Sequence, residues 1–492
     1  MGILSGLEPK SVFIFFEEIC QIPHGSGNVK AISDYLRRFA KERNLFCIQD
    51  ELKNIIIIKE AAAGYEKEAP YILQGHMDMV AVREPDCDMD MAKEGLRLKM
   101  ADGKVYAEGT SLGGDDGIGV AYCLALLDAD IALPRLEVIL TVDEETGMEG
   151  ATGIDLSMLL GRRMINLDQE EEGIFITSCA GGARVDVIIP VKRDGICTDD
   201  MQLMEVKVSG LSGGHSGMEI NKGRGNANCL LGEVLRALSE HMELRLVSMQ
   251  GGVADNAIAR EAMAVLAVKR EEAGILEEVA ATKQEAIRRI LQEGDPNVTV
   301  VCNPIPQDGS GEDGCKAGCF YTTDSTRNAL DCLGKLPNGV IAMSQDVEGL
   351  VETSLNLGVL VLSEEGLRLQ YAVRSSVDAR KEELCRKMTE IAQEAGAQVS
   401  IHGSYPGWAY QKESALRDKM VRIYESMYGK EPVLQAIHAG LECGILSAKI
   451  EGLDCVCVGP DLQDVHTTQE KMDIASVGRV WEYLLAVLGQ KD

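Results

Sequence analysis

The chain has 492 residues, 45% of them hydrophobic, and a formal net charge of −29 at pH 7. This length exceeds the size at which one hydrophobic core usually divides, so we expect two or more domains. The negative charge disfavours nucleic acid and anionic membranes as partners, because both would repel the protein. No apolar run approaches the roughly 20 residues that a membrane-spanning helix needs.

The N-terminal residues predict an amphipathic helix and no signal peptide, because acidic residues interrupt the apolar stretch. The 15 cysteines follow no regular framework. In a chain of this length they indicate reduced, largely buried thiols. We therefore expect a cytoplasmic protein.

The first third of the chain alternates helix and strand patterns. Val29, Ile32, Leu36 and Phe39 recur at helical spacing after a loop at 24–27, and residues 118–127 form a nearly continuous apolar helix. Short apolar runs predict strands at 54–58, 71–74, 136–142 and 164–167. Strands separated by helices indicate an α/β fold with a mostly parallel sheet, covered by helices on both faces.

The pattern changes near residue 186. Residues 186–404 combine alternating strands at 204–208, 359–362 and 367–373 with charged helices such as 275–291. The segment 303–318 is rich in Pro, Gly and Asp and is expected to be a loop. The α/β pattern resumes with a helix at 415–428 and a strand at 455–458. We therefore predict a catalytic domain in two parts, 1–185 and 405–492, interrupted by an inserted α+β domain at 186–404.

Polar residues follow the predicted strands. His76 and Asp78 are two apart in extended chain and share a face, so the carboxylate of Asp78 can orient a metal-bound imidazole of His76. Ligand sites in parallel sheets lie outside the carboxyl ends of the strands. By itself this triplet is also compatible with an ordinary polar strand end.

A Gly-rich turn at 113–119 contains Asp115 and Asp116 before the apolar helix. Such a turn can cradle phosphate, but two carboxylates would repel phosphate and no lysine follows at P-loop spacing. The carboxylates suit a cation. A plain helix N-cap is the alternative.

Three consecutive acids, Asp143, Glu144 and Glu145, follow the strand at 136–142. Buried carboxylates are costly unless water or cations neutralise them. A metal bound to one of them, with another left free to carry a proton, would give them different roles. Asp168 and His466 also follow predicted strands. Each cluster alone fits a surface, but together they predict a metal site.

The combined motifs resemble the dinuclear zinc peptidases related to carboxypeptidase G and aminoacylase. In order, they are HMD, GGDDGIG, DEETG, NLDQEE and DVHT. Three further strings resemble the aminoacyl-histidine dipeptidase (peptidase D) branch of this family: GGHSG at 213–217, GNAN at 225–228 and IHAGLECG at 437–444. The resemblance spans nearly the whole chain.

The resemblance implies two divalent metal ions, with Zn²⁺ expected and Co²⁺ or Mn²⁺ compatible with the same ligands. One ion would be held by His76 and Asp168, the other by Glu145 and His466, with Asp115 bridging. Glu144 would be the general base that takes a proton from a metal-bridged water, and Asp78 the second catalytic group. The family also implies a cis peptide bond between Asp115 and Asp116, which a non-proline sequence seldom forms.

The same resemblance assigns substrate-binding roles in the inserted domain and near the C-terminus. His215 would stabilise the oxyanion. Asn256 and Arg374 would bind the substrate backbone and its carboxylate. Gly440 and Gly444 would bound the substrate, and a structural role is favoured for His438. The inserted domain would act as a lid and as the surface of a homodimer.

The sequence thus predicts a cytosolic metallo-dipeptidase that cleaves unblocked dipeptides, including Xaa-His and β-alanyl-histidine. An N-acyl-amino-acid deacylase or a tripeptidase could use the same metal core, but the strings of the peptidase D branch disfavour both. A non-catalytic binding homologue should have lost ligands, and none of the five positions is substituted. A phosphate-handling metalloenzyme is disfavoured because no basic cradle is present.

Overall fold

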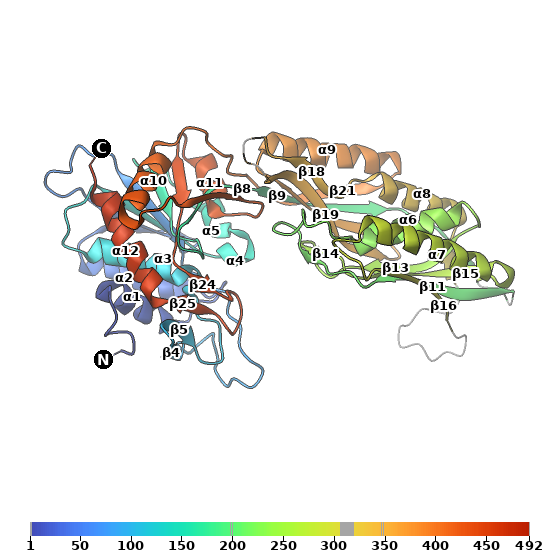
Figure 1. Ribbon diagram of the computed structural model, residues 1–492, viewed down its shortest axis with the longest axis horizontal. Coiled ribbons are helices and arrows are strands. Elements are labelled where there is room, and N and C mark those ends of the chain that lie inside the picture. The colour runs from blue at the N-terminus through green and yellow to red at the C-terminus, as the bar shows by residue number, and fades with distance from the viewer. Residues whose placement is uncertain are drawn as a thin grey trace. The chain divides into compact units, whose positions relative to one another are not determined.

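The computed structural model describes residues 2–196, 198, 200–305, 319–345, 347 and 349–491, folded into two compact units (Figure 1). The first unit comprises Met1–Cys179, Trp408–Ala436 and Leu441–Asp492. The second comprises Ala180–Gly407 and Ile437–Gly440. The second unit is therefore an insertion within the first.

The first unit is built on an eight-stranded sheet. Its four central strands, in the order β6-β3-β7-β23, are parallel, and the flanking pairs β1–β2, β2–β6 and β23–β8 are antiparallel. The α/β fold class is confirmed, with the parallel pairing confined to the centre of the sheet. In spatial order the strands are β1 (Phe46–Gln49), β2 (Ile55–Lys59), β6 (Leu136–Thr141), β3 (Tyr71–His76), β7 (Arg163–Asn166), β23 (Asp454–Cys457), β8 (Ile174–Cys179) and β22 (Val433–Ile437).

Helices cover both faces of this sheet. Every residue of β3 and β6 is buried, as expected for strands with covered faces. Along β3, Leu73 belongs to the hydrophobic core that includes α3, whereas the next side chain, Gln74, bonds to Glu442 of α11. Because successive side chains of a strand point to opposite faces, α3 and α11 lie on opposite sides.

The helices of the first unit surround this core (Figure 1). They are α1 (Lys10–Cys20), α2 (Lys30–Glu42), α3 (Gly114–Asp128), α4 (Glu144–Gly147), α5 (Glu149–Gly153), α10 (Ala415–Tyr428), α11 (Glu442–Lys449) and α12 (Ile474–Gly489). A small antiparallel sheet joins β4 (Leu98–Ala101), β5 (Lys104–Ala107), β25 (Lys471–Asp473) and β24 (Leu462–Gln463). The predicted apolar helix at 118–127 is confirmed as most of α3, buried over almost its whole length.

The second unit is an antiparallel sheet covered by helices, which confirms the α+β insertion. Its main strands are β16 (Thr299–Pro304), β11 (Met201–Ser209), β15 (Ala262–Lys269), β13 (Arg245–Gly251), β19 (Val351–Leu362), β20 (Leu367–Ser375), β9 (Gly181–Ile189) and β21 (Gln398–Tyr405), with β18 (Gly339–Met343) beside β19. Two short ribbons pair β12 (Gly214–His215) with β14 (Ala257–Ile258), and β10 (Arg193–Ile196) with β17 (Cys319–Tyr321).

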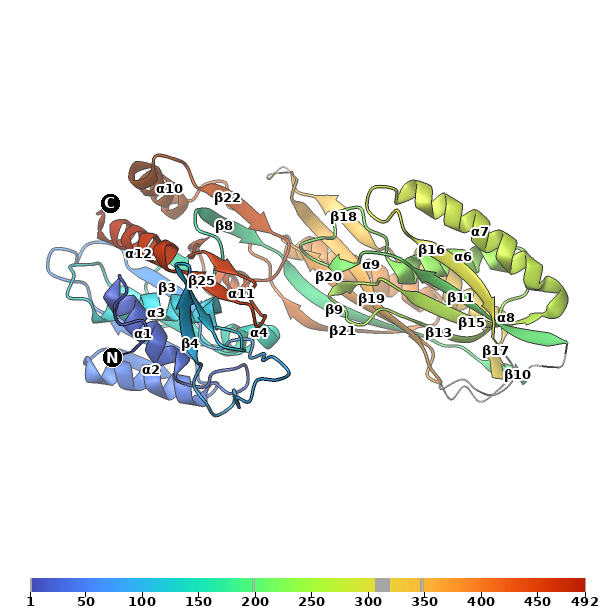
Figure 2. The same ribbon diagram turned by 60° about the horizontal axis from the view of Figure 1, so that its bottom comes forward.

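The alternation of buried and more exposed residues along the strands shows that one face of this sheet is covered. In β9, Val185, Val187 and Ile189 are buried in the core of the second unit, and the intervening side chains are more exposed. The helices contact one another in the order α7-α6-α8-α9 (Figure 1), and Figure 2 shows α7 along its length. They are α7 (Ala273–Ile290), which follows the 3-10 turn η1 (Arg270–Glu272), α6 (Ala227–Ser239), α8 (Thr323–Lys335) and α9 (Asp378–Glu394).

The expected loop at 303–318 is only partly described. Asn303 and Pro304 end strand β16, and residues 306–318 lie outside the described part of the chain. The predicted helix at 415–428 coincides with α10, and that at 275–291 with α7 to within two residues. Among the described residues, no helix combines the length and apolar character that crossing a membrane requires.

Truncation of Leu124 to alanine should lower the free energy of unfolding of the first unit by about 2–5 kcal/mol, because the lost side chain leaves a cavity in the core. Leu124 is fully buried in α3. Both tryptophans, Trp408 and Trp481, belong to the first unit, so tryptophan fluorescence during urea unfolding reports on this unit.

Leu160→Ala is the matched control, because Leu160 is in the same unit with 63% of its surface exposed. Its free energy of unfolding should stay within about 0.5 kcal/mol of the wild type. Equal losses in the two variants would contradict the burial of α3.

Candidate metal centre and substrate-binding residues

The strands of the first unit bring the predicted ligands to one edge of the sheet. His76 is the last residue of β3, Glu144 and Glu145 follow β6, and Asp168 follows β7. These three strands are parallel neighbours, so their carboxyl ends lie side by side. Asp115 enters from the start of α3, and His466 from the segment between β24 and β25.

Four side chains gather around the carboxylate of Asp115. Its Oδ1 lies 3.1 Å from Nε2 of His76, and its Oδ2 lies 3.1 Å from Nε2 of His466. The Nε2 atom of His76 is also 3.4 Å from Oδ1 of Asp168, and that of His466 is 2.9 Å from Oε1 of Glu145. The structure thus brings together the two predicted ligand groups, with Asp115 facing both histidines.

Asp116, next to Asp115, has a different environment. Its side chain is buried, and it accepts hydrogen bonds from the backbone N–H groups of His76 (3.1 Å) and Gly119 (3.1 Å). The peptide bond between Asp115 and Asp116 is cis, which confirms the expectation from the family resemblance. One of the two adjacent acids therefore faces the histidines, and the other is tied to the backbone.

Glu470, which the sequence analysis did not identify, holds the Gly-rich turn. Its carboxylate is buried and accepts hydrogen bonds from the N–H groups of Leu112 (2.8 Å), Gly113 (3.1 Å) and Gly114 (2.7 Å). Gly113 has φ 67°, a left-handed conformation that glycine adopts readily. A glutamate more than 350 positions from its partners carries no local signal, so only the fold reveals this contact.

Asp78 lies next to the imidazole of His76, as predicted. The hydrogen bond of that imidazole, however, is made to the main-chain carbonyl of Asp78 and not to its carboxylate. Nδ1 of His76 is 3.0 Å from the carbonyl oxygen of Asp78 and 3.6 Å from its carboxylate. That carboxylate accepts hydrogen bonds from the hydroxyl of Ser26 (2.8 Å) and the N–H of Glu144 (3.1 Å). Asp78 thereby connects the loop at 24–27 to the turn that carries the two glutamates.

The charges of this cluster favour a cation. Burial and the nearby charge of Asp115 raise the pKa of Asp168 to about 8. Burial, with the charges of Asp168, Glu442 and Asp115, raises the pKa of Glu144 well above its usual value. Hydrogen bonds to Asp115 and Glu145 raise the pKa of His466 to about 11. Imidazole nitrogen and carboxylate oxygen, without a thiolate, suit Zn²⁺, Co²⁺ or Mn²⁺, so these residues fit the predicted metal pair.

The predicted substrate-binding residues occupy the second unit, except for Gly444 at the start of α11 in the first. His215 and Asn256 lie at one short ribbon: His215 pairs with Ala257, and the N–H of Ser216 donates to the carbonyl of Asn256 (2.8 Å). Burial and the charge of Arg374 lower the pKa of His215, which favours its neutral form. Gly440 closes the segment Ile437–Gly440.

Arg374 lies on β20 opposite Ser354 of β19. Its Nε is buried and has no hydrogen-bond partner among the described residues. The hydroxyl of Ser354 lies 2.7 Å from Nε2 of His438, whose side chain is buried. This contact agrees with the structural role favoured for His438.

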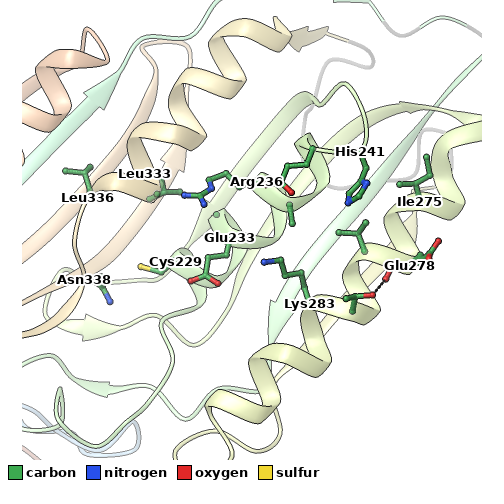
Figure 3. Close-up of a pocket in the computed structure, with 16 residues that line it drawn as sticks. Cys229, Glu233, Arg236, His241, Ile275, Glu278, Lys283, Leu333, Leu336 and Asn338 are labelled. Carbon is green, nitrogen blue, oxygen red and sulfur yellow. Dashed lines mark hydrogen bonds between the residues drawn. The ribbon is translucent and has the colours of Figure 1, made fainter.

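A cavity of about 830 Å³ elsewhere in the second unit contains none of the predicted site residues. It lies between α6, α7 and α8 and is lined by side chains that include Glu233, Arg236 and Lys283 (Figure 3). Charges of both signs line it. The predicted chemistry is therefore separate from this cavity.

A parallel α/β core with imidazole and carboxylate groups at the carboxyl edge of its sheet fits the class of metal-dependent hydrolases. The chain belongs to peptidase family M20/M25/M40, because the model of this family matches residues 72–490. Family membership confirms the resemblance inferred from the motifs.

Known proteins are similar to the chain along nearly its full length. It is 35% identical over 489 residues to the cytosol non-specific dipeptidase of Escherichia coli (strain K12), covering 99% of each chain. Its structure is similar to that of aminoacylhistidine dipeptidase from Vibrio alginolyticus, with a TM-score of 0.91, 34% identity, and 100% and 98% of the two chains covered. The aminopeptidase PepT of Bacillus cereus ATCC 10987 shares the fold at a TM-score of 0.59 and 16% identity, covering 98% of each chain.

The buried His438 should make the protein less stable in mild acid. Burial, together with the charge of Arg374, lowers the pKa of His438 to about 3. An unfolded histidine titrates near pH 6.5, so below that pH only the unfolded state gains this proton. The contribution of His438 to the free energy of unfolding is complete above about pH 6.5. It falls by up to about 1.4 kcal/mol per pH unit as the pH drops toward 3.

The variant His438→Gln removes this proton uptake. Its thermal midpoint, followed by circular dichroism, should fall less than that of the wild type between pH 7 and pH 5.5. His241→Gln, an exposed position in the same unit, should keep the wild-type loss. Identical pH dependence of the wild type and His438→Gln would show that His438 is not buried in its neutral form.

Proposed function

We propose that this protein is a cytosolic metallo-dipeptidase that hydrolyses unblocked dipeptides, including Xaa-His and β-alanyl-histidine. Two divalent metal ions, Zn²⁺ by preference, would be held by His76 and Asp168 and by Glu145 and His466, with Asp115 shared. The observation that carries this proposal is the carboxylate of Asp115, each of whose oxygens lies 3.1 Å from one histidine. When bound, such a metal pair supplies Lewis acidity for water and for the scissile carbonyl.

Glu144 is the proton carrier in this proposal. Burial raises its pKa, which makes its carboxylate a better proton acceptor. It takes a proton from the attacking water and delivers it to the leaving amine. The hydrogen bond from its N–H to Asp78 fixes the start of α4, so Asp78 orients both His76 and Glu144.

We assign the catalytic role to the first unit and the lid role to the second. All five proposed ligands belong to the first unit, which supports this division. In the second, the guanidinium of Arg374, whose Nε–H has no hydrogen-bond partner among the described residues, would bind the C-terminal carboxylate of the substrate. His215 would stabilise the oxyanion, Asn256 would bind the substrate backbone, and Gly440 and Gly444 would bound the substrate.

The names of the two relatives at 34–35% identity support a dipeptidase over a tripeptidase or an N-acyl-amino-acid deacylase. The likeness to PepT, at 16% identity, supports the fold alone. The E. coli relative is also described as cytosolic, which supports the same compartment here. The intact set of metal-binding side chains argues against a non-catalytic homologue.

We further propose that the second unit forms a homodimer. Strand β18 pairs only with β19 among the described strands. It exposes Val340, Ile341 and Met343, which gives an apolar edge suited to a second copy of the chain. No nucleic acid or membrane partner is proposed, because the charge of −29 opposes both.

Replacement of Glu144 by glutamine should lower kcat by at least about 100-fold, because the amide cannot carry the proton. Binding of two metal ions per chain should persist, because Glu144 is outside the proposed ligand set. Turnover of a dipeptide and metal content by elemental analysis, both on metal-reconstituted protein, test the two statements.

Glu149→Gln provides the control for this variant, because it makes the same change at an exposed residue of the adjacent helix α5. It should retain wild-type turnover. Wild-type turnover in Glu144→Gln would exclude Glu144 as the general base.

The substrate class can be tested with one panel on metal-reconstituted protein: an Xaa-His dipeptide, β-alanyl-histidine, a dipeptide without histidine, a tripeptide and an N-acyl amino acid. Dipeptides should have the highest kcat/KM. The removal of metal by a chelator should abolish turnover, and added Zn²⁺ or Co²⁺ should restore it. A preference for the tripeptide or the acyl compound would overturn the dipeptidase assignment.

A further inference from the structure

Four polar side chains lie inside the first unit, beneath the edge of the sheet that carries the proposed ligands. They are Gln74 of β3, Thr141 of β6, Asn166 of β7 and Glu442 of α11, and each has 0% of its surface exposed. Polar groups rarely occupy such positions unless their hydrogen bonds are made within the protein.

Glu442 is the centre of this buried cluster. Its Oε2 accepts hydrogen bonds from the amide of Gln74 (2.5 Å) and from the hydroxyl of Thr141 (2.6 Å). The carbonyl oxygen of the Gln74 side chain in turn accepts a bond from the amide of Asn166 (2.6 Å). One carboxylate of α11 is therefore linked to three neighbouring strands.

Each strand residue of the cluster lies just before a proposed functional group. Gln74 precedes His76 by two positions and Asn166 precedes Asp168 by two. In the sheet register, Gln74 pairs with both Ile139 and Asn166, and Thr141 pairs with His76. Thr141 ends β6, directly before the turn that holds Glu144 and Glu145. A shift between these strand ends would move His76, Asp168 and Glu145 relative to one another.

Hydrophobic packing alone does not fix such a position well, because apolar contacts are not directional. Hydrogen bonds fix both distance and angle, and in a dry interior they are stronger than in water. The other oxygen of Glu442, Oε1, has no hydrogen-bond partner among the described residues. A buried carboxylate that leaves one oxygen unpaired lowers stability, which argues against a purely stabilising role.

We propose that Glu442 is a positioning residue for the metal centre: through Gln74, Thr141 and Asn166 it sets the spacing of the strand ends that carry the metal ligands. It acts as a hydrogen-bond acceptor and touches neither metal nor substrate. This inference rests on the proposed metal-dependent function. Groups behind the ligands of a metal typically alter its affinity by about 10- to 100-fold.

The test is a titration of metal-free protein with Co²⁺, followed by visible absorption and by calorimetry. Glu442→Ala should weaken Co²⁺ binding by about 10- to 100-fold and alter the absorption band, because the ligand geometry loosens. Glu442→Gln should bind with an affinity and a spectrum close to the wild type, because the amide oxygen of glutamine can accept the same two hydrogen bonds.

Glu137→Ala is the matched control. Glu137 is a carboxylate with 0% exposure on the same strand β6, and it accepts hydrogen bonds from Arg135, Leu160 and Gly161, near the opposite end of the strand. Its loss should lower the urea midpoint reported by tryptophan fluorescence while leaving Co²⁺ affinity and spectrum unchanged. General loss of stability is thereby separated from loss of positioning.

Wild-type Co²⁺ affinity and spectrum in folded Glu442→Ala would overturn the proposal, even if the wild type binds two ions and cleaves dipeptides. A glutamine variant that binds as weakly as the alanine variant would also overturn it, because charge rather than hydrogen bonding would then be responsible. If Glu442→Ala does not fold, Thr141→Val decides: it removes one of the two hydrogen bonds at nearly constant shape, and unchanged Co²⁺ binding would refute the role. A wild type that binds no Co²⁺ would refute the metal-dependent function itself.

Discussion

The repulsion among Asp115, Glu145, Asp168 and Glu144 is the constraint on which the first unit depends. Carboxylates gathered in a largely buried site oppose one another, and burial disfavours their charged forms. The two imidazoles, His76 and His466, offset part of this repulsion, as the raised pKa of His466 shows. Two cations would offset it more fully, which supports the proposed metal centre.

The scaffold holds these groups in place through contacts with the main chain. Asp116 accepts from the N–H of His76, and Glu470 accepts from three successive N–H groups of the Gly-rich turn. Asp78 accepts from the N–H of Glu144. Each contact fixes the backbone that carries a functional side chain, and each uses an acid that is itself outside the proposed ligand set. These acids thus support the residues that are proposed as ligands.

The second unit provides a different environment. Its antiparallel sheet places Arg374 and Ser354 opposite each other, and the short ribbon carries His215 near Asn256. Burial and the charge of Arg374 lower the pKa of both His215 and His438. The Nε–H group of Arg374 has no hydrogen-bond partner among the described residues, which agrees with the role proposed for it in binding a carboxylate. The proposed metal ligands therefore belong to the first unit, and most of the proposed substrate-binding residues belong to the second.

Local sequence was sufficient for much of the fold. Short apolar runs predicted the central strands, because buried strands need continuous apolar residues, and the helix at 118–127 followed from its apolar length. The antiparallel edges of the first sheet were not predictable in this way, because strand direction depends on pairing between distant segments. The expectation that His76, Glu145 and Asp168 lie at or just after the ends of strands is confirmed by their positions at β3, β6 and β7.

By itself, then, the sequence determined the α/β core, the inserted unit, and the identity of the residues that gather around Asp115. Only the tertiary structure decided the role of the neighbouring acid, Asp116, whose buried carboxylate accepts hydrogen bonds from the N–H groups of His76 and Gly119. It also revealed Glu470 and Glu442, whose partners lie hundreds of positions away in the sequence. Hydrogen bonds between distant segments leave no local periodicity, and they form only when folding brings those segments together.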